Sequence, residues 1–339
     1  MIKTKREWYS QMDGLRFVAV FFVLLEHFAY YIGHPIHAGF FGVDLFFVIS
    51  GFLITEGLLI DKYSEDGFWL TMGRFYAKRF LRIFPIYYLF LWIAFFTIGY
   101  SREIKQWTFT YTLNYYPFFS SKTIEPPFDH LWSLNVEEQF YILWPFVLLL
   151  ISRRFLLPLL LALFTGSIIY FLLRSDYIGL AGRMYSLCMG AILAFYKQFQ
   201  GDKYNAQAQK RFLIILAAAI LLFFFNDSIG LSFLSFGLVY LCSCSAFPGI
   251  FKKFLEHRSV SYFGKISYGV YLYHLPLAYF ITKYIFDPVW KNINFGKFYL
   301  LNFHSWIIKF PLYTLVVLLV AHISYRFIEK PILKFKNKI

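Results

Sequence analysis

The segment R-F-V-A-V-F-F-V-L-L-E-H, residues 16–27, places ionisable side chains at both ends of an apolar run. An apolar run dissolves in lipid with little penalty, whereas an ionisable group near the middle of a bilayer costs at least ~2.5–3.5 kcal/mol. Arg16, Glu26 and His27 therefore predict a polar site buried among membrane helices.

The composition of the 339-residue chain extends this interpretation to its full length. Apolar residues make up 59% of the chain and charged residues only 15%, whereas soluble domains carry about 25% charged residues. The mean hydropathy is +0.56. We therefore expect an integral membrane protein.

About ten stretches are long and apolar enough to cross a bilayer, which takes about 20 helical residues. They fall near residues 14–33, 38–60, 83–100, 131–151, 155–174, 179–197, 210–227, 229–247, 262–286 and 304–328. An even number puts both termini on one side, and roughly 24 of the 33 Lys and Arg lie there, which marks the cytoplasm. The expected fold is all-α and polytopic, one domain over residues 1–339 with both termini cytoplasmic.

The net charge of +14 is explained by this topology and requires no nucleic-acid partner. Basic loops beside a membrane also favour anionic lipid headgroups. Cys188, Cys242 and Cys244 all lie inside apolar segments, so neither a disulfide framework nor a thiolate metal site is indicated. We expect no bound metal and membrane lipid as a partner.

Helix rise predicts which polar residues reach the same depth. His27 lies about 16 Å from the inner interface, Asp44 roughly 8 Å below the outer surface, and Glu137 and Glu138 about 10–12 Å below it. These side chains can converge in the outer half of the membrane. A histidine beside a carboxylate is a general base with a fixed tautomer. The alternative is a polar network that only locks helices together.

A second cluster, R-F-Y-A-K-R-F-L-R-I-F-P over residues 74–85, is basic and predicted to be cytoplasmic. Arg74, Lys78 and Arg82 share one helix stripe, and Arg79 and Arg82 pair at i, i+3. Arginine forks bind phosphate bidentately, so this face suits a cofactor with several phosphates. A basic turn before a span can also be only a topology signal.

Further polar residues in or near the spans are candidates for binding the acceptor substrate. Asp13 is too far along its helix to orient His27, by about 21 Å. Each of these residues has a purely structural alternative as well. The candidates are Asp13, His130, Tyr141, Arg183 and His274.

Seven motifs stand in order along the chain. They are D-G-L-R at 13–16, Arg16 with His27 ten residues beyond it, F-F-G-V-D-L-F-F-V-I-S-G-F-L-I-T at 40–55, R-x-x-R at 79–82, H-L-W-S-L-N-V-E-E-Q-F-Y at 130–141, I-S-Y-G-V-Y-L-Y-H at 266–274 and F-I-E-K-P at 327–331. Together they closely resemble the acyltransferase-3 family of bacterial inner-membrane O-acyltransferases. The resemblance runs from about residue 10 to 332. The chain resembles the stand-alone type of this family, without an appended extracytoplasmic domain.

The resemblance implies transfer of an acyl group, commonly acetyl, from cytoplasmic acyl-CoA to a hydroxyl of a cell-surface carbohydrate or glycolipid. It implies that Arg16 and His27 are essential and that Arg79 and Arg82 serve the CoA donor. His27 would either deprotonate the acceptor or carry the acyl group, and a carboxylate would orient it.

Two other functions stay open from the sequence. A transporter or flippase of a glycolipid would use the same polar core as its pathway, and a structural subunit of a polysaccharide assembly would tolerate changes at His27. A second copy of the chain also stays open as a partner.

Overall fold

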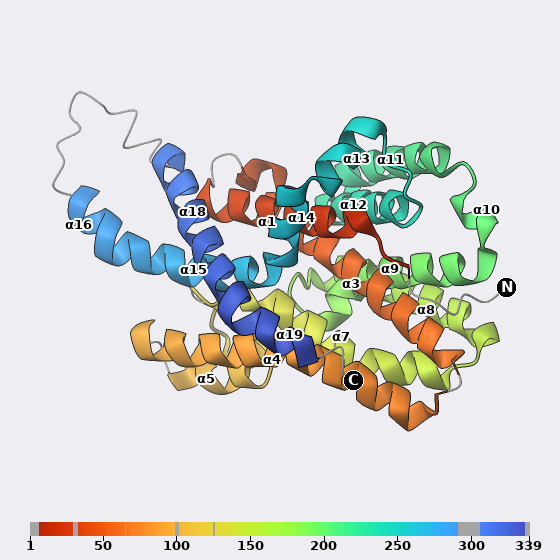
Figure 1. The fold of residues 1–339 in the computed structure, drawn as a ribbon, viewed down its shortest axis with the longest axis horizontal. Coiled ribbons are helices and arrows are strands. Elements are labelled where there is room, and N and C mark those ends of the chain that lie inside the picture. The colour runs from red at the N-terminus through yellow and green to blue at the C-terminus, as the bar shows by residue number, and fades with distance from the viewer. Residues whose placement is uncertain are drawn as a thin grey trace.

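The computed structural model describes residues 7–29, 33–64, 66–98, 102–124, 126–290 and 306–335, and these contain helices and no strand. The long helices are α1 (Ser10–Phe28), α3 (Ala38–Lys62), α4 (Phe68–Ile98), α7 (Leu131–Leu150), α8 (Arg153–Arg174), α9 (Leu180–Gln200), α11 (Ala208–Phe225), α12 (Asp227–Ser243), α15 (Ser267–Ile281) and α18 (Trp306–Ser324). The short ones are η1 (His34–Ile36), α5 (Arg102–Phe109), η2 (Leu113–Tyr115), α6 (Tyr116–Ser120), α10 (Asp202–Asn205), α13 (Gly249–Glu256), α14 (Arg258–Lys265), α16 (Asp287–Trp290) and α19 (Lys330–Phe335). Short π-helical turns, Thr282–Phe286 and Tyr325–Glu329, follow α15 and α18. Figure 1 shows their arrangement.

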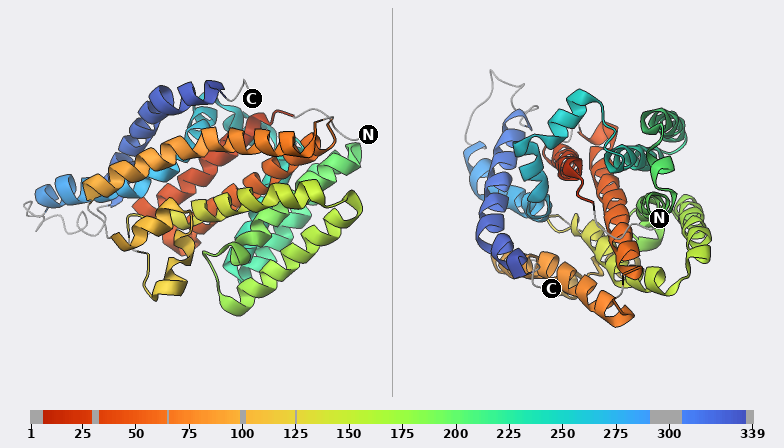
Figure 2. Two further views of the ribbon diagram at one scale, coloured as in Figure 1. Left: turned by 90° about the horizontal axis from the view of Figure 1, so that it is seen from below. Right: turned by 45° about the vertical axis from the view of Figure 1, so that its right-hand side comes forward.

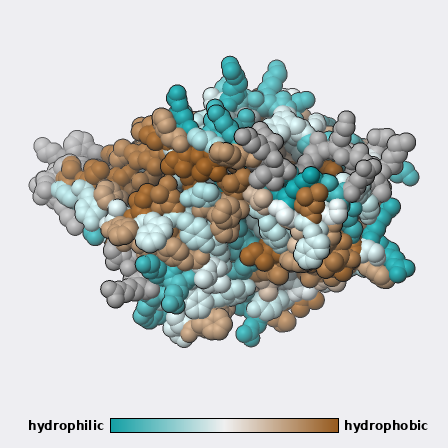
Figure 3. Space-filling view, turned by 60° about the horizontal axis from the view of Figure 1, so that its bottom comes forward, coloured by the Kyte–Doolittle hydropathy of each residue, from teal (hydrophilic) through white to brown (hydrophobic). Residues whose placement is uncertain are grey.

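The helical content and apolar surface fit the expected all-α membrane protein. Five helical segments are long and apolar enough to cross a membrane: Ala38–Lys62, Phe68–Ile98, Arg153–Arg174, Ala208–Phe225 and Ile307–Phe335. Each of the ten predicted stretches contains a helix, but ten crossings and cytoplasmic termini stay predictions. Figure 3 shows a broad hydrophobic area bordered by hydrophilic side chains.

Helix α4 differs from the expected third span. It begins at Phe68 rather than near residue 83, and it continues through Pro85. The basic cluster therefore lies on the same continuous helix as the apolar segment that follows it, not in a separate loop. This geometry fixes the direction of the arginine side chains relative to the bundle.

Helix α3 lies at the centre of the bundle. It packs against α1, α4, α7, α9 and α12, and the two views of Figure 2 show it surrounded by other helices. Its contact with α9 is close because small residues face backbone: a Cβ added at Gly51 would lie 2.0 Å from the Leu187 carbonyl oxygen, and one at Gly190 2.1 Å from that of Val48. Small residues allow this approach.

Helices α13 and α14 hold the start of α1 in a similar way. A Cβ at Gly14 would lie 2.4 Å from the Leu255 carbonyl oxygen, and one at Gly264 1.7 Å from that of Asp13. Glu256 accepts hydrogen bonds from Ser10 (2.7 Å) and from the Gln11 amide (3.0 Å). The segment that carries Asp13 and Arg16 is therefore fixed from two sides.

Candidate functional site

Two cavities meet between α1, α3, α4 and the segment around α15. The entrance cavity, of about 480 Å³, is lined by Glu7, Trp8, Tyr9, Met12, Asp13, Arg16, Leu53, Glu56, Gly57, Arg79, Arg82, Lys265, Tyr268, Tyr325, Glu329 and Leu333. The deep cavity, of about 110 Å³, shares five of these residues: Arg16, Leu53, Arg79, Arg82 and Tyr268. The cavities therefore adjoin at a ring that contains three arginines. Glu7, the first described residue, and Leu333, two residues before the last described one, both line the entrance.

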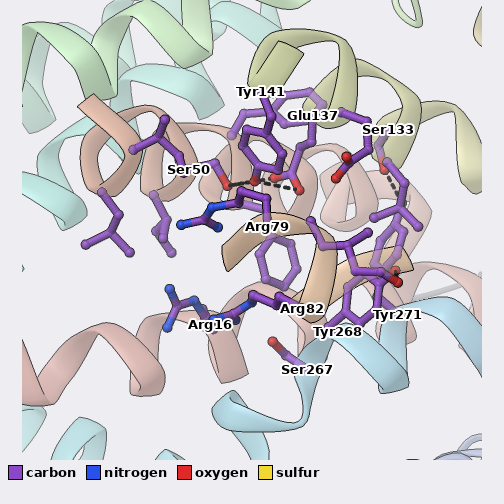
Figure 4. A pocket seen from close by; sticks show the side chains of 18 of the residues that line it. Arg16, Ser50, Arg79, Arg82, Ser133, Glu137, Tyr141, Ser267, Tyr268 and Tyr271 are labelled. Carbon is purple, nitrogen blue, oxygen red and sulfur yellow. Dashed lines mark hydrogen bonds between the residues drawn. The ribbon is translucent and has the colours of Figure 1, made fainter. Parts of the chain in front are cut away.

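The three arginines come from two helices and point into the same space (Figure 4). Arg79 and Arg82 lie one helical turn apart on α4, and Arg16 approaches from α1. Arg16 donates to Asp13 at 2.6 Å and its side chain remains 19% exposed. The Arg79 guanidinium lies 5.4 Å from the centre of the Tyr141 ring. Three cations around one opening favour an anionic ligand with several charges.

The other two residues of the predicted phosphate site lie elsewhere. Arg74 pairs with Asp66 near the start of α4. Neither Arg74 nor Lys78 lines either cavity. The structure therefore brings together Arg79 and Arg82 with Arg16, and leaves Arg74 and Lys78 outside this group.

Carboxyl groups and hydroxyls line the deep cavity beyond the arginines. Glu137 accepts hydrogen bonds from Ser50 (2.8 Å) and Tyr141 (3.3 Å), as Figure 4 shows. Glu138 lines the same cavity and is only 6% exposed. At the far end, the Ser133 and Tyr271 hydroxyls lie 2.6 Å apart.

Behind this pair, three helices bring a histidine cluster together: His27 on α1, His130 before α7 and His274 on α15. The ring centres of His27 and His274 are 4.9 Å apart, and those of His130 and His274 are 4.8 Å apart. The Tyr271 ring contacts both His130 and His274. Tyr271 and Ser133 therefore separate the deep cavity from the histidines, and His27 lines neither of the two cavities.

Hydrogen bonds to carbonyl groups define the tautomers in this cluster. His27 Nδ1 lies 2.9 Å from the Val23 carbonyl oxygen, and His274 Nδ1 contacts that of Tyr271. A carbonyl oxygen only accepts, so both Nδ1 atoms carry hydrogen when the rings are neutral. His274 Nε2 is then an acceptor, 3.2 Å from His27 Nδ1. This assignment leaves the lone pair on His27 Nε2 available, on a ring that is still exposed.

The carboxylates predicted to orient His27 lie in other contacts. Asp44 is fully buried and pairs with Arg183 at 3.4 Å, and it accepts from Ser186 (3.1 Å) and Ser232 (2.7 Å). This network joins α3, α9 and α12. Glu137 and Glu138 belong to the deep cavity instead. Among the described residues, none of these three carboxylates is hydrogen-bonded to His27. Depth in the membrane alone does not determine the direction in which a side chain points from its helix.

The residues predicted to bind the acceptor substrate also lie in different parts of the structure. His130 and His274 join His27, Tyr141 lines the deep cavity and Asp13 lines the entrance. Arg183 instead lies among aromatic rings, with its guanidinium 5.2 Å from the centre of Phe40.

Sequence reasoning missed Asp129, which interacts electrostatically with His27. Its position directly before His130 was the available signal. It also missed Tyr271 and Ser133 as the boundary of the deep cavity. Both lie in the motifs around His274 and His130, but no spacing rule relates one motif to the other.

Comparison with known proteins shows which family and which relatives the chain is similar to. A family described as an acyltransferase domain matches residues 9–326. O-acetyltransferase OatA of Staphylococcus aureus is 29% identical over 95% of this chain and 57% of its own length. Peptidoglycan O-acetyltransferase OatA of Listeria monocytogenes is 27% identical over 97% of this chain and 56% of its own length. The chain thus spans a little over half the length of these curated relatives. No solved structure matches it.

Proposed function

Because this chain belongs to the acyltransferase-domain family, whose match covers residues 9–326, we propose that it moves an acetyl group from acetyl-CoA to a hydroxyl of a cell-surface glycan. The names of the relatives, O-acetyltransferase and peptidoglycan O-acetyltransferase, support acetyl transfer to a glycan. We place the protein in the bacterial cytoplasmic membrane, with the entrance cavity on the cytoplasmic side.

The observation that carries this proposal is the order in which polar side chains line the two cavities, from the entrance to the deep end. Arg16, Arg79 and Arg82 surround their junction, where they would bind the phosphates of CoA through charge-assisted hydrogen bonds. Lys265 lines the entrance beside them. The narrow deep cavity then suits the uncharged pantetheine arm, whose thioester would reach Ser133 and Tyr271.

His27 acts as the general base in this proposal. Its free Nε2 takes the proton from the acceptor hydroxyl, and the hydroxyl oxygen attacks the thioester carbonyl carbon. The carbon–sulfur bond breaks, and the proton passes from the imidazolium to the leaving CoA thiolate. A positioned general base contributes typically 10²–10⁴-fold, and holding both substrates together contributes through proximity. Tyr271 and Ser133 must separate before the thioester reaches His27.

The test is release of free CoA thiol from acetyl-CoA by purified protein in detergent, with a glycan acceptor present. His27→Ala should lose turnover by about 10²–10⁴-fold and keep CoA binding. His257→Ala, at an exposed histidine, is the matched control and should behave as wild type. Normal turnover in His27→Ala would refute the base assignment. Absence of CoA binding in folded wild type would refute the donor.

A further inference from the structure

An exposed tryptophan lies in the wall of the entrance cavity, and the proposed acyl transfer does not use it. Trp8 lines this cavity together with Arg16, Arg79 and Arg82, and it is 78% exposed. Tryptophan is common at membrane interfaces, where it anchors a protein without binding a ligand. Trp69 fits that role, because it is 80% exposed and lines neither of the two cavities. The place of Trp8 in a cavity wall calls for a different explanation.

The residues on either side of Trp8 have buried partners. The Glu7 carboxylate lies 3.2 Å from Nζ of Lys197, a lysine that is only 3% exposed. The Tyr9 hydroxyl donates a hydrogen bond to Glu56, and Lys197 Nζ lies 5.0 Å from the centre of the Tyr9 ring. These contacts hold the segment, so the Trp8 indole meets a ligand from a fixed position. Binding to a group that is already ordered costs less conformational entropy.

Trp8 offers more free ring surface than the other aromatic residues of the entrance cavity. Besides Trp8, these are Tyr9, Tyr268 and Tyr325. Tyr9 is buried, and Tyr268 and Tyr325 are half-buried. Aromatic rings attract one another in offset-stacked arrangements. An indole that stays exposed beside a polar cavity is therefore suited to stack on an aromatic ligand.

Charge divides the entrance cavity into two parts. Arg16, Arg79 and Arg82 also line the deep cavity, so they lie at the junction. The acidic residues line the entrance and not the deep cavity; they are Glu7, Asp13, Glu56 and Glu329. Phosphates therefore fit the junction, whereas the part of the entrance away from it suits an uncharged group. The acidic side chains can accept hydrogen bonds from such a group.

CoA carries its groups in a fixed order: thioester, pantetheine arm, diphosphate and adenosine. With the pantetheine in the deep cavity and the diphosphate at the arginines, the adenosine lies on the entrance side, in the cavity that Trp8 lines. Adenine is flat and uncharged, and its amino group donates hydrogen bonds. It therefore matches both the exposed indole and the acidic side chains.

We propose that Trp8 stacks on this adenine, an assignment that rests on the proposed CoA donor, and that the protein thereby prefers CoA to a donor without the nucleotide. Every nucleobase has a π-face, and stacking on an aromatic side chain changes affinity by about 5- to 150-fold per base. Trp8 acts in donor recognition and takes no part in the bond changes at the thioester.

The experiment measures the equilibrium affinity of the purified protein in detergent for CoA and for 4′-phosphopantetheine, which lacks the adenosine. Wild type should bind CoA more tightly. Trp8→Ala should weaken CoA binding by about 5- to 150-fold and leave 4′-phosphopantetheine binding unchanged. Trp8→Phe, which keeps a ring, should lose less. Trp69→Ala is the matched control at another exposed tryptophan and should bind both ligands as wild type does.

The results separate this proposal from the proposed function. Unchanged CoA affinity in Trp8→Ala, or an equal loss for both ligands, would overturn the stacking and leave the CoA donor in place. An equal loss of CoA affinity in Trp69→Ala would also overturn it, in favour of a general effect of exposed tryptophans. Folded wild type that binds neither ligand would refute the CoA donor itself, and the stacking with it.

Discussion

The contact between His274 and His27 gives a quantitative prediction about the proposed base. His27 Nδ1 has two acceptors nearby, the Val23 carbonyl oxygen at 2.9 Å and His274 Nε2 at 3.2 Å. Removing His274 as an acceptor leaves the backbone carbonyl in place. The tautomer that exposes Nε2 should therefore be weakened but not lost.

The size of the effect follows from one hydrogen bond. A net contribution of about 0.5–1.5 kcal/mol corresponds to a fall in kcat of about 2- to 13-fold. We expect this loss for His274→Phe, which keeps most of the ring volume at a fully buried position. His274→Gln should recover most of the rate, because the side-chain carbonyl of glutamine accepts a hydrogen bond.

The assay is the CoA thiol release measured for wild type, His274→Phe, His274→Gln and His27→Ala, with melting temperature recorded for each. His274→Phe also leaves the Tyr271 carbonyl without its histidine partner, so some loss of stability is expected, separate from kcat. If folded His274→Phe lost as much kcat as His27→Ala does, the reasoning would be refuted, and His274 would be the residue that takes the proton from the acceptor. Equal rates for Phe and Gln would show that His274 does not hold the tautomer.

Three further predictions concern the donor site and the bundle. Arg82→Gln should raise the KM for acetyl-CoA about 10- to 150-fold, since a hydrogen bond to a charged group contributes about 1.5–3 kcal/mol. Arg74→Gln should change this KM little. Equal effects of the two substitutions would contradict the assignment of Arg82 to the cavities. Gly51→Ala should lower the stability by about 1–3 kcal/mol through overpacking, because its Cβ would meet backbone of α9. Gly73→Ala, at a position with open space, should raise the stability by about 0.5–1 kcal/mol. Thermal unfolding that ranks the two variants in the opposite order would refute the packing argument. Asp44→Ala should destabilise by about 3–5 kcal/mol because it leaves a buried charge unpaired, and folded protein should bind CoA as wild type does.

The arrangement of the site also explains why charge clusters differ in role. Arg79 and Arg82 share α4 with Arg74 and Lys78, but a helix turns about 100° per residue, so neighbouring cations face different surroundings. The i, i+3 pair faces the cavities, and Arg74 faces Asp66. Sequence spacing places all four on one helix, and the packing of that helix against α3 and α15 turns two of them toward the cavities.

The sequence by itself determined the membrane class, the helical content and the family. Apolar runs and sparse charges require helices in lipid, since every backbone polar group must be satisfied within its own segment. The ionisable residues inside those runs, His27 and His274 among them, were identified as candidates because of their cost in lipid. The seven motifs then matched a family that covers residues 9–326.

Only the tertiary structure decided which candidates meet. Depth estimates put Asp44, Glu137 and Glu138 at the level of His27, but depth is one coordinate, and the direction in which each helix faces is set by packing such as that of Gly51 on α9. The packing of α3 on α9 brings Asp44 to Arg183, and the separate packing of α15 on α1 brings His274 to His27 across 247 residues of sequence. The pairing of buried polar groups thus depends on helix rotation, which a local pattern along one helix does not encode.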